Sequence, residues 1–120
     1  VVAFLLAFRE GADYDSPNYR WFAQRYPRFL YIDRVVVAAA AKGQGLGKAL
    51  YQVAFRLAET NSVPLLVCEF DLEPPNPVSA GFHARMGFRE VGQQRVAGGN
   101  KVVSLQLARV GERLPPTADA

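Results

Sequence analysis

The stretch of sequence that decides the fold is YIDRVVVAAAAKGQGLGKAL, residues 31–50. It opens with an apolar run centred on Val35-Val36-Val37, which lacks the alternation of a half-exposed strand and is typical of a strand buried on both faces. Small residues and three glycines follow, and from Leu46 onward apolar residues recur at helical spacing. The stretch therefore predicts a central strand over Phe29–Val37, a glycine-rich loop over residues 38–47, and then a helix.

The predicted helix runs from Leu46 to the turn signal at Asn61-Ser62. Its expected core-facing stripe follows the spacing i, i+3, i+4, i+7, i+8 and i+11, while charged and amide side chains lie off it. The residues of this stripe are Leu46, Ala49, Leu50, Val53, Ala54 and Leu57. The pattern predicts an amphipathic helix that packs one face on the sheet.

The rest of the chain predicts four more strands and two short helices. The strands are expected over Val1–Arg9, Pro64–Phe70, Phe88–Val96 and Lys101–Val110. One short helix should begin after an N-cap at Ser16 and end at Pro27, and the other should span Val78–Met86 and stop at Gly87. This order predicts one α/β domain over residues 1–110, a mixed sheet flanked by helices, and a polar, flexible tail over residues 111–120.

Composition narrows the classes of partner. The 120 residues carry a net charge of +3, which suits an anionic small ligand, and no run of five Lys/Arg residues marks a nucleic-acid site. No apolar run of about 18 residues indicates a membrane span. A single cysteine, Cys68, and a single histidine, His83, form neither an internal disulfide nor a Cys/His metal cluster. We therefore expect a cytoplasmic protein that needs no metal, nucleic acid or membrane.

The loop Lys42-Gly43-Gln44-Gly45-Leu46-Gly47-Lys48 has the features of an anion site. Glycines let the backbone approach a ligand closely, and the N-terminus of the following helix carries a partial positive charge. Lys42 and Lys48 add full charges at the two ends of the loop. The loop therefore predicts phosphate binding, with a ligand-free strand-to-helix turn as the alternative.

Spacing excludes two common phosphate motifs. A Walker P-loop needs a glycine five positions before its Gly-Lys pair and a hydroxyl residue after it, and here those places hold Lys42 and Ala49. A dinucleotide fingerprint needs Gly-x-Gly-x-x-Gly, and the third glycine would fall at Lys48 or Leu50. The loop must therefore serve another kind of phosphate ligand.

Two segments resemble the GNAT superfamily of N-acetyltransferases. The strand and loop over residues 31–50 are similar to its acyl-CoA signature, Arg/Gln-x-x-Gly-x-Gly/Ala, with Lys42 in the Arg/Gln place. Residues 76–88, NPVSAGFHARMGF, resemble its Asn-x-x-Ala/Ser-x-x-Phe-Tyr-x-x-x-Gly-Phe segment, with His83 in place of the tyrosine. The resemblance implies the GNAT acyltransferase fold and direct transfer of an acetyl group from acetyl-CoA to a primary amine.

The resemblance also implies which residues hold the cofactor. Backbone amides of the glycine loop would cradle the pyrophosphate, the strand at Val35–Val37 would pair with the pantetheine arm, and Asn76 would hydrogen-bond the cofactor. The full set expected to bind acetyl-CoA is Val35, Val36, Val37, Lys42, Gly43, Gln44, Gly45, Leu46, Gly47, Lys48, Asn76, Ser79 and Phe82. A main-chain N–H on the same strand would polarise the thioester carbonyl.

Such proteins usually carry a strand, one or two helices and another strand before the segment that begins here at Val1. The sequence also begins with valine rather than methionine. We therefore expect the native protein to have a longer N-terminus. The expected partners are acetyl-CoA and an unidentified amine, and a homodimer is also allowed.

Three residues are candidates for proton transfer. His83 would face the thioester sulfur, and an imidazole with a reference pKa of about 6.5 can protonate a departing thiolate; packing is its alternative role. Asp33 and Glu69 lie on otherwise apolar strands, so either could take the proton of the attacking amine. Asp33 could instead pair with the adjacent Arg34, which favours Glu69 as the base.

Other residues have simpler alternative roles. Cys68 could carry an acyl group, but alternation places it on the opposite face from Glu69, and a buried inert thiol is favoured. Asn76 could cap the short helix as well as contact the cofactor. The aromatic residues expected on the first short helix could line the acceptor site or pack in the core. They are Tyr19, Trp21, Phe22 and Tyr26.

Two other functions compete with acetyl transfer. A non-catalytic acyl-CoA-binding module would use the same loop, and the missing N-terminal part and His83 favour that alternative. A nucleotide-phosphate binder would also use the loop, but the failed Walker and dinucleotide spacings argue against it. Thioester turnover separates the enzyme from the binding module.

Overall fold

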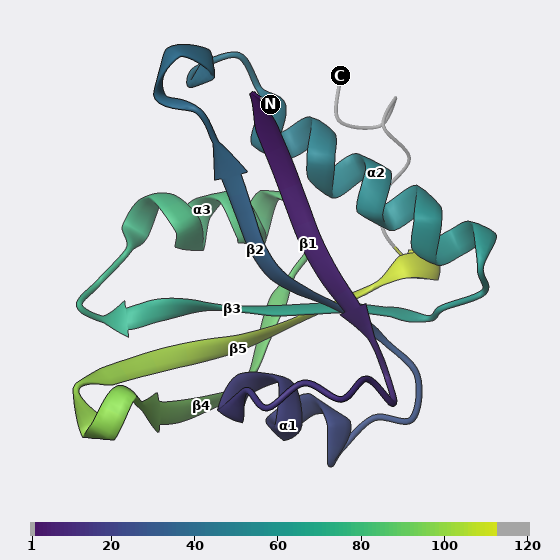
Figure 1. Cartoon of the computed structure of the whole chain (residues 1–120), viewed down its shortest axis with the longest axis vertical. Helices are drawn as coiled ribbons and strands as arrows, with labels where there is room; N and C mark the ends of the chain where they lie inside the picture. The colour runs from purple at the N-terminus through teal and green to yellow at the C-terminus, as the bar shows by residue number, and fades with distance from the viewer. Residues whose placement is uncertain (1, 113–120) are drawn as a thin grey trace.

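The computed structural model describes residues 2–112, which form a mixed α/β domain. Its elements, in chain order, are β1 (Ala3–Arg9), α1 (Pro17–Ala23), β2 (Leu30–Val37), α2 (Leu46–Thr60), β3 (Leu65–Glu73), α3 (Pro77–Arg85), β4 (Arg89–Val96) and β5 (Lys101–Arg109) (Figure 1). The predicted order of strands and helices is therefore confirmed. The tail expected over residues 111–120 lies almost entirely outside the described residues.

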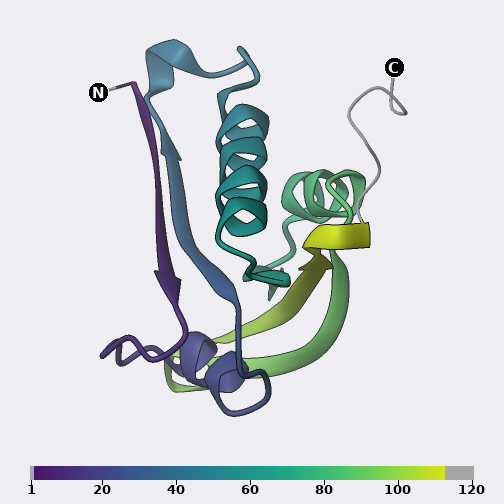
Figure 2. The ribbon, with the colours of Figure 1, turned by 90° about the vertical axis from the view of Figure 1, so that its right-hand side faces the viewer.

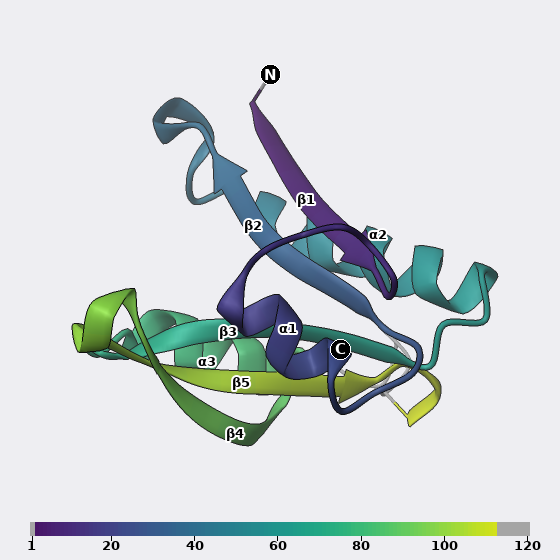
Figure 3. The same ribbon diagram turned by 60° about the horizontal axis from the view of Figure 1, so that its bottom comes forward.

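The strands form one sheet in the order β1-β2-β3-β5-β4. Only β2 and β3 are parallel, and every other neighbouring pair is antiparallel. Helix α2 lies along β1 and β2, with α3 on the same side of the sheet (Figure 2), while α1 covers the opposite face of β3 and β5 (Figure 3). The sheet therefore separates two hydrophobic cores, one under α2 and one under α1.

The parallel pairing of β2 with β3 is short. It joins only Leu30 to Leu66 and Tyr31 to Val67, after which the two strands diverge (Figure 1). Where β2 pairs with β1, the register shifts so that Asp33 has no partner residue, which is the pattern of a β-bulge. A bulge bends its strand and strengthens the local twist, so it helps to turn β2 away from β3.

This divergence corrects the expected burial of the central strand. The first residues of β2 are buried, but Val36 is 39 % exposed and Val35 and Val37 are only half-buried. The apolar run at Val35–Val37 therefore does not mark a strand covered on both faces. Without β3 alongside, this part of β2 is covered by α2 on one face only.

The core-facing stripe of α2 also differs from the expected one. The buried residues are Tyr51, Ala54, Phe55 and Ala58, whereas Val53 and Leu57 are 49 % and 53 % exposed. Ala54 alone belongs to both the expected and the buried set. With α2 in this orientation, the aromatic rings of Tyr51 and Phe55 are buried. An aromatic side chain removes about 150–250 Å² of accessible surface from water.

The two short helices have the caps that the sequence indicates. The Ser16 hydroxyl accepts a hydrogen bond from the backbone N–H of Tyr19, and α1 ends at Ala23, four residues before Pro27. The Asn76 side chain accepts from the backbone N–H of Ser79 at the start of α3. Within residues 2–112, no helix is long and apolar enough to cross a membrane.

The orientation of α2 predicts unequal costs for two truncations on the same helix. Phe55→Ala should lower the free energy of unfolding by about 3–5 kcal/mol, because Phe55 is fully buried against Phe88. Leu57→Ala should change it by less than about 0.5 kcal/mol, because that side chain is exposed. Urea denaturation of both variants measures the difference. A larger loss for Leu57→Ala than for Phe55→Ala would mean that α2 packs through the stripe expected from periodicity.

Candidate functional site

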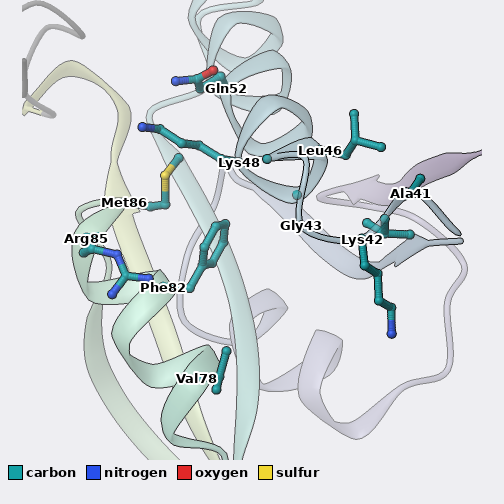
Figure 4. A pocket seen from close by; sticks show the side chains of 13 residues that line it. Ala41, Lys42, Gly43, Leu46, Lys48, Gln52, Val78, Phe82, Arg85 and Met86 are labelled. Carbon is teal, nitrogen blue, oxygen red and sulfur yellow. The ribbon is translucent and has the colours of Figure 1, made fainter. Parts of the chain in front are cut away.

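A groove lies between the glycine loop and α3, which we call the glycine-loop groove. It has a volume of about 880 Å³ and is lined from one side by Lys42, Gly43 and Gly45–Lys48, and from the other by Phe82, Arg85 and Met86. In Figure 4, Lys48 extends from α2 toward Met86, while Lys42 points away from Lys48. The groove therefore combines an apolar wall on α3 with cationic side chains on both sides.

The loop presents backbone donors at the start of α2. Gly45 is the N-cap and has a positive φ of 74°, and no side chain caps the helix there. The first N–H groups of a helix have no partner within the helix, so those of Leu46, Gly47 and Lys48 are available to an anion. A Cβ atom added at Gly45 or Gly47 would meet no other atom within 4 Å, which shows that the space above the loop is open.

A second cavity, of about 650 Å³, opens where β2 and β3 diverge, and we call it the interstrand cavity. Its lining includes both predicted carboxylates, Asp33 and Glu69, together with Cys68 and His83. Lys42, Gly47, Phe82 and Arg85 line both spaces, so the interstrand cavity adjoins the glycine-loop groove.

The residues predicted to bind the cofactor divide between these two spaces. Most of the loop, with Val37 and Phe82, lines the glycine-loop groove, and Val35, Asn76 and Ser79 line the interstrand cavity. Among the described residues of the predicted set, Val36 and Gln44 line neither space. The lining residues that the sequence did not indicate are Ala41, Gln52, Val78, Arg85 and Met86 in the groove. Arg85 could have been found from its place inside the second motif.

Glu69 is the carboxylate with the most perturbed environment. Burial raises its pKa to about 7, against the effect of a hydrogen bond donated by the Tyr31 hydroxyl at 2.7 Å, and the negative charge of Asp33 raises the pKa further. A carboxyl group with this pKa exchanges a proton near neutral pH, so it can act as a base.

Asp33 is held differently. It accepts a hydrogen bond from the Tyr14 hydroxyl at 2.5 Å, and its other oxygen lies 3.9 Å from Nε of Arg34. The ion pair considered as its alternative role is therefore present, although long. The structure thus brings both carboxylates to one cavity.

His83 is buried, and both of its ring nitrogens have partners. Nδ1 donates to the backbone carbonyl of Ser79 at 2.8 Å, since a carbonyl oxygen can only accept. In the neutral ring Nε2 is then an acceptor, and the Tyr51 hydroxyl donates to it at 2.8 Å. Burial lowers the pKa of His83, against the effect of the Ser79 hydrogen bond. Direct proton donation by His83 remains a prediction, and its resting form offers no free N–H to the cavity.

Tyr51 is a further residue that the sequence analysis missed, and it lies in the interstrand cavity. It lies on the buried face of α2, lines the interstrand cavity and is 6 % exposed. Tyr51 was missed because the expected core-facing stripe of α2 includes Leu50 and Val53 but not Tyr51, which is buried in the structure. An aromatic residue four positions before Phe55 was the available signal.

Several residues that were candidates for catalysis or ligand binding have structural roles, in packing or helix capping. Cys68 is fully enclosed and burial raises its pKa, which is the environment of an inert thiol. Tyr19 and Phe22 are buried in the core under α1, with Trp21 and Tyr26 packed against them. Asn76 both caps α3 and lines the interstrand cavity. Over the described part of the chain, no group of three or more His, Cys, Asp and Glu side chains is placed to hold a metal ion.

Comparisons with known proteins were made for both sequence and structure. The sequence profile of the Acetyltransferase (GNAT) family matches residues 2–88. A search of curated proteins finds no match. Among solved structures, an acetyltransferase of the GNAT family from Listeria monocytogenes 4b F2365 is 20 % identical, with a TM-score of 0.71, and the match covers 91 % of this chain and 58 % of that one.

Two further structures show the same fold. The ribosomal-protein-S18-alanine N-acetyltransferase of Escherichia coli is 18 % identical, with a TM-score of 0.65, and the match covers 95 % of this chain and 66 % of that one. The NatC complex bound to Gag peptide and CoA is 14 % identical, with a TM-score of 0.69, and the match covers 90 % and 60 %. The chain thus spans less than two thirds of the length of these three structures.

The open loop predicts a charge-specific effect at Gly47. Gly47→Asp should weaken CoA binding by at least about tenfold, because it would place a negative charge beside the phosphate that is expected to bind at this loop. Gly47→Ala is the matched control and should bind normally, since the added Cβ meets no atom and the backbone there is helical. Calorimetry on both folded variants measures the affinities. Gly45 is less suitable, because its positive φ strains any side chain. Normal binding by Gly47→Asp would contradict a phosphate site at this loop.

Proposed function

This chain belongs to the Acetyltransferase (GNAT) family, and from that membership we propose that it transfers an acetyl group from acetyl-CoA to a primary amine. One observation carries the proposal. The glycine-loop groove, with its backbone N–H groups and cationic side chains, adjoins the interstrand cavity, which contains the Glu69 carboxyl group with a pKa of about 7. A phosphate-bearing donor and a base for an amine acceptor would then be neighbours.

The donor is proposed to enter from the side of α2 and α3. Its pyrophosphate would accept hydrogen bonds from the N–H groups at the start of α2, with Lys48 and Arg85 supplying positive charge on the two sides of the groove. Its pantetheine arm would lie along β2 beyond Tyr31, where the described part of β3 no longer pairs with that edge. The CoA named in the NatC structure, which has the same fold, supports this choice of donor.

The acceptor is proposed to enter from the opposite face. Tyr31, which holds Glu69, belongs to the core under α1, and Tyr14, which holds Asp33, packs against the same core. Donor and amine would therefore meet in the gap between β2 and β3, each arriving from its own side of the sheet. Holding two reactants in this way removes much of the entropic barrier to their reaction.

The proposed reaction is direct attack of the neutral amine on the thioester carbonyl. A C–N bond forms, the Glu69 carboxylate takes the proton that the nitrogen loses, and the C–S bond then breaks. A main-chain N–H of β2 would stabilise the charge on the carbonyl oxygen. A non-catalytic binding module would need no base, so the placement of Glu69 favours the enzyme over that alternative.

The first test is turnover of acetyl-CoA in the presence of a panel of amines that includes small amines and peptides with free N-termini. We expect release of free CoA with at least one amine, at a rate above that of hydrolysis. CoA binding by calorimetry without turnover of any amine in the panel would instead support the binding module.

The second test concerns Glu69. Glu69→Gln should lower kcat/KM about 10²-fold or more, because the amide cannot take a proton but can still accept the Tyr31 hydrogen bond. In the wild type, kcat/KM should rise with pH through about 7, because only the deprotonated carboxylate is a base. Glu73→Gln, at the exposed end of the same strand, is the matched control and should be unaffected. An unchanged rate in Glu69→Gln would exclude this base.

A further inference from the structure

The first turn of α1 lies beside Glu69. Leu65 and Val67 of β3 belong to the core under α1, and because side chains alternate along a strand, Glu69 projects to the same face. Helix α1 begins directly after its N-cap Ser16, so Asn18 is in its first turn. The Asn18 side chain is within hydrogen-bonding reach of the Glu69 carboxyl group. An element that belongs to neither the glycine loop nor α3 therefore contacts the proposed base.

A residue of β4 decides which atom of Asn18 serves Glu69. Gln94 donates from Nε2 to Oδ1 of Asn18 at 3.0 Å. The side chain of an asparagine has one acceptor oxygen and one donor NH₂ group. Since the oxygen already accepts from Gln94, and a carboxylate can only accept, the NH₂ group of Asn18 is the part that can donate to Glu69. The hydrogen bond from β4 thus fixes the orientation of the amide.

The same turn also supports the second donor to Glu69. The Tyr31 hydroxyl donates to Oε1 of Glu69 at 2.7 Å, and Ser16 is within hydrogen-bonding reach of that hydroxyl. The Ser16 oxygen accepts the backbone N–H of Tyr19, so its own proton is free to be donated to Tyr31. A carboxylate has about four acceptor positions, and these two donors leave positions open for the proton of an amine.

We propose that Asn18 is a positioning residue for acetyl transfer, and that Gln94 holds its amide so that Glu69 keeps an open acceptor position toward the interstrand cavity. This inference rests on the proposed function and adds two residues to it. Asn18 neither gives up nor receives a proton in the reaction. It orients the carboxylate and stabilises its charged form, which is the form that acts as the base.

The groups around Glu69 give the sign of the expected effect. Hydrogen bonds from Tyr31 and Asn18 favour the charged form and lower the pKa that burial raises, while the charges of Asp33 and Asp71 raise it further. Loss of the Asn18 donor should therefore raise the pKa of Glu69. The other titratable or charged side chains that line the cavity or interact with Glu69 stay in place in the variants below. They are Tyr14, Arg34, Lys42, Tyr51, Cys68, His83 and Arg85.

The kinetic test compares Asn18→Ala with Asn100→Ala, a matched change of an exposed asparagine after β4. With one amine throughout, Asn18→Ala should lower kcat/KM about tenfold at pH 6 and less than about twofold at pH 9, because Glu69 is largely deprotonated in both proteins at the higher pH. Asn100→Ala should match wild type at both. A loss of equal size at the two pH values, or no loss, would mean that Asn18 only supports α1 and would overturn the proposal.

A second measurement needs no turnover. Titration of the Glu69 carboxyl carbon by NMR, with Glu69→Gln to identify the signal, gives its pKa directly. Wild type and Asn100→Ala should titrate near 7, and Asn18→Ala should titrate higher. Gln94→Leu, which removes only the bond that orients Asn18, should also titrate higher. The same pKa in folded Asn18→Ala as in wild type would overturn the proposal.

Asn18→Asp covers the case in which Asn18→Ala does not fold. Its oxygen can still accept from Gln94, the side chain keeps its shape, and an acidic residue suits the first turn of a helix. Because it exchanges the donor for a negative charge, the pKa of Glu69 should rise, and an unchanged pKa would overturn the proposal. If these variants shift the pKa of Glu69 but wild type acetylates no amine, the proposed function fails and the positioning of Glu69 stands.

Discussion

The two-residue pairing between β2 and β3 is the constraint on which the site depends. A longer parallel ladder would join Asp33 to the strand that carries Glu69 and would close the interstrand cavity. The strands instead separate after Tyr31 and Val67, next to the irregular residue Asp33. The hydrophobic cores on the two faces hold the separated strands in place, α2 supporting one face and α1 the other. The opening is thus built into a stable sheet.

The two faces of this opening have different electrostatics. Backbone N–H groups and cationic side chains gather on the side of α2 and α3. These cationic side chains keep their charged ends in water, so their desolvation cost is low. Carboxyl groups lie on the other side, each with a tyrosine hydroxyl donating to it. The tyrosine bond offsets part of the desolvation of Glu69, which leaves its pKa near 7 rather than far above it. An anionic donor and an amine acceptor suit these opposite faces.

The sequence predicted what depends on local pattern and failed where tertiary packing decides. Alternation, caps and glycines locate the strands, the loop and α3, and the two motifs indicate the family. Periodicity placed Leu57 on the core-facing stripe of α2 and left Phe55 off it, whereas in the structure Phe55 is buried and Leu57 is exposed. The apolar Val36 likewise looks central, because no local signal shows that β3 turns away. The partners of His83 could not be predicted either, since Tyr51 lies 32 residues away along the chain.

Helix α2 connects these features, because it takes part in both halves of the site. Its first turn carries the free N–H groups, and Gly47 and Tyr51, one turn apart on the same face, both line the interstrand cavity. Four helical residues rise about 6 Å, and a helix packed along the sheet keeps that spacing. The glycine loop and the part of the interstrand cavity beside Tyr51 are therefore fixed relative to each other by one rigid element. Gly47 leaves open space above the first turn of α2, where an added Cβ would meet no other atom within 4 Å.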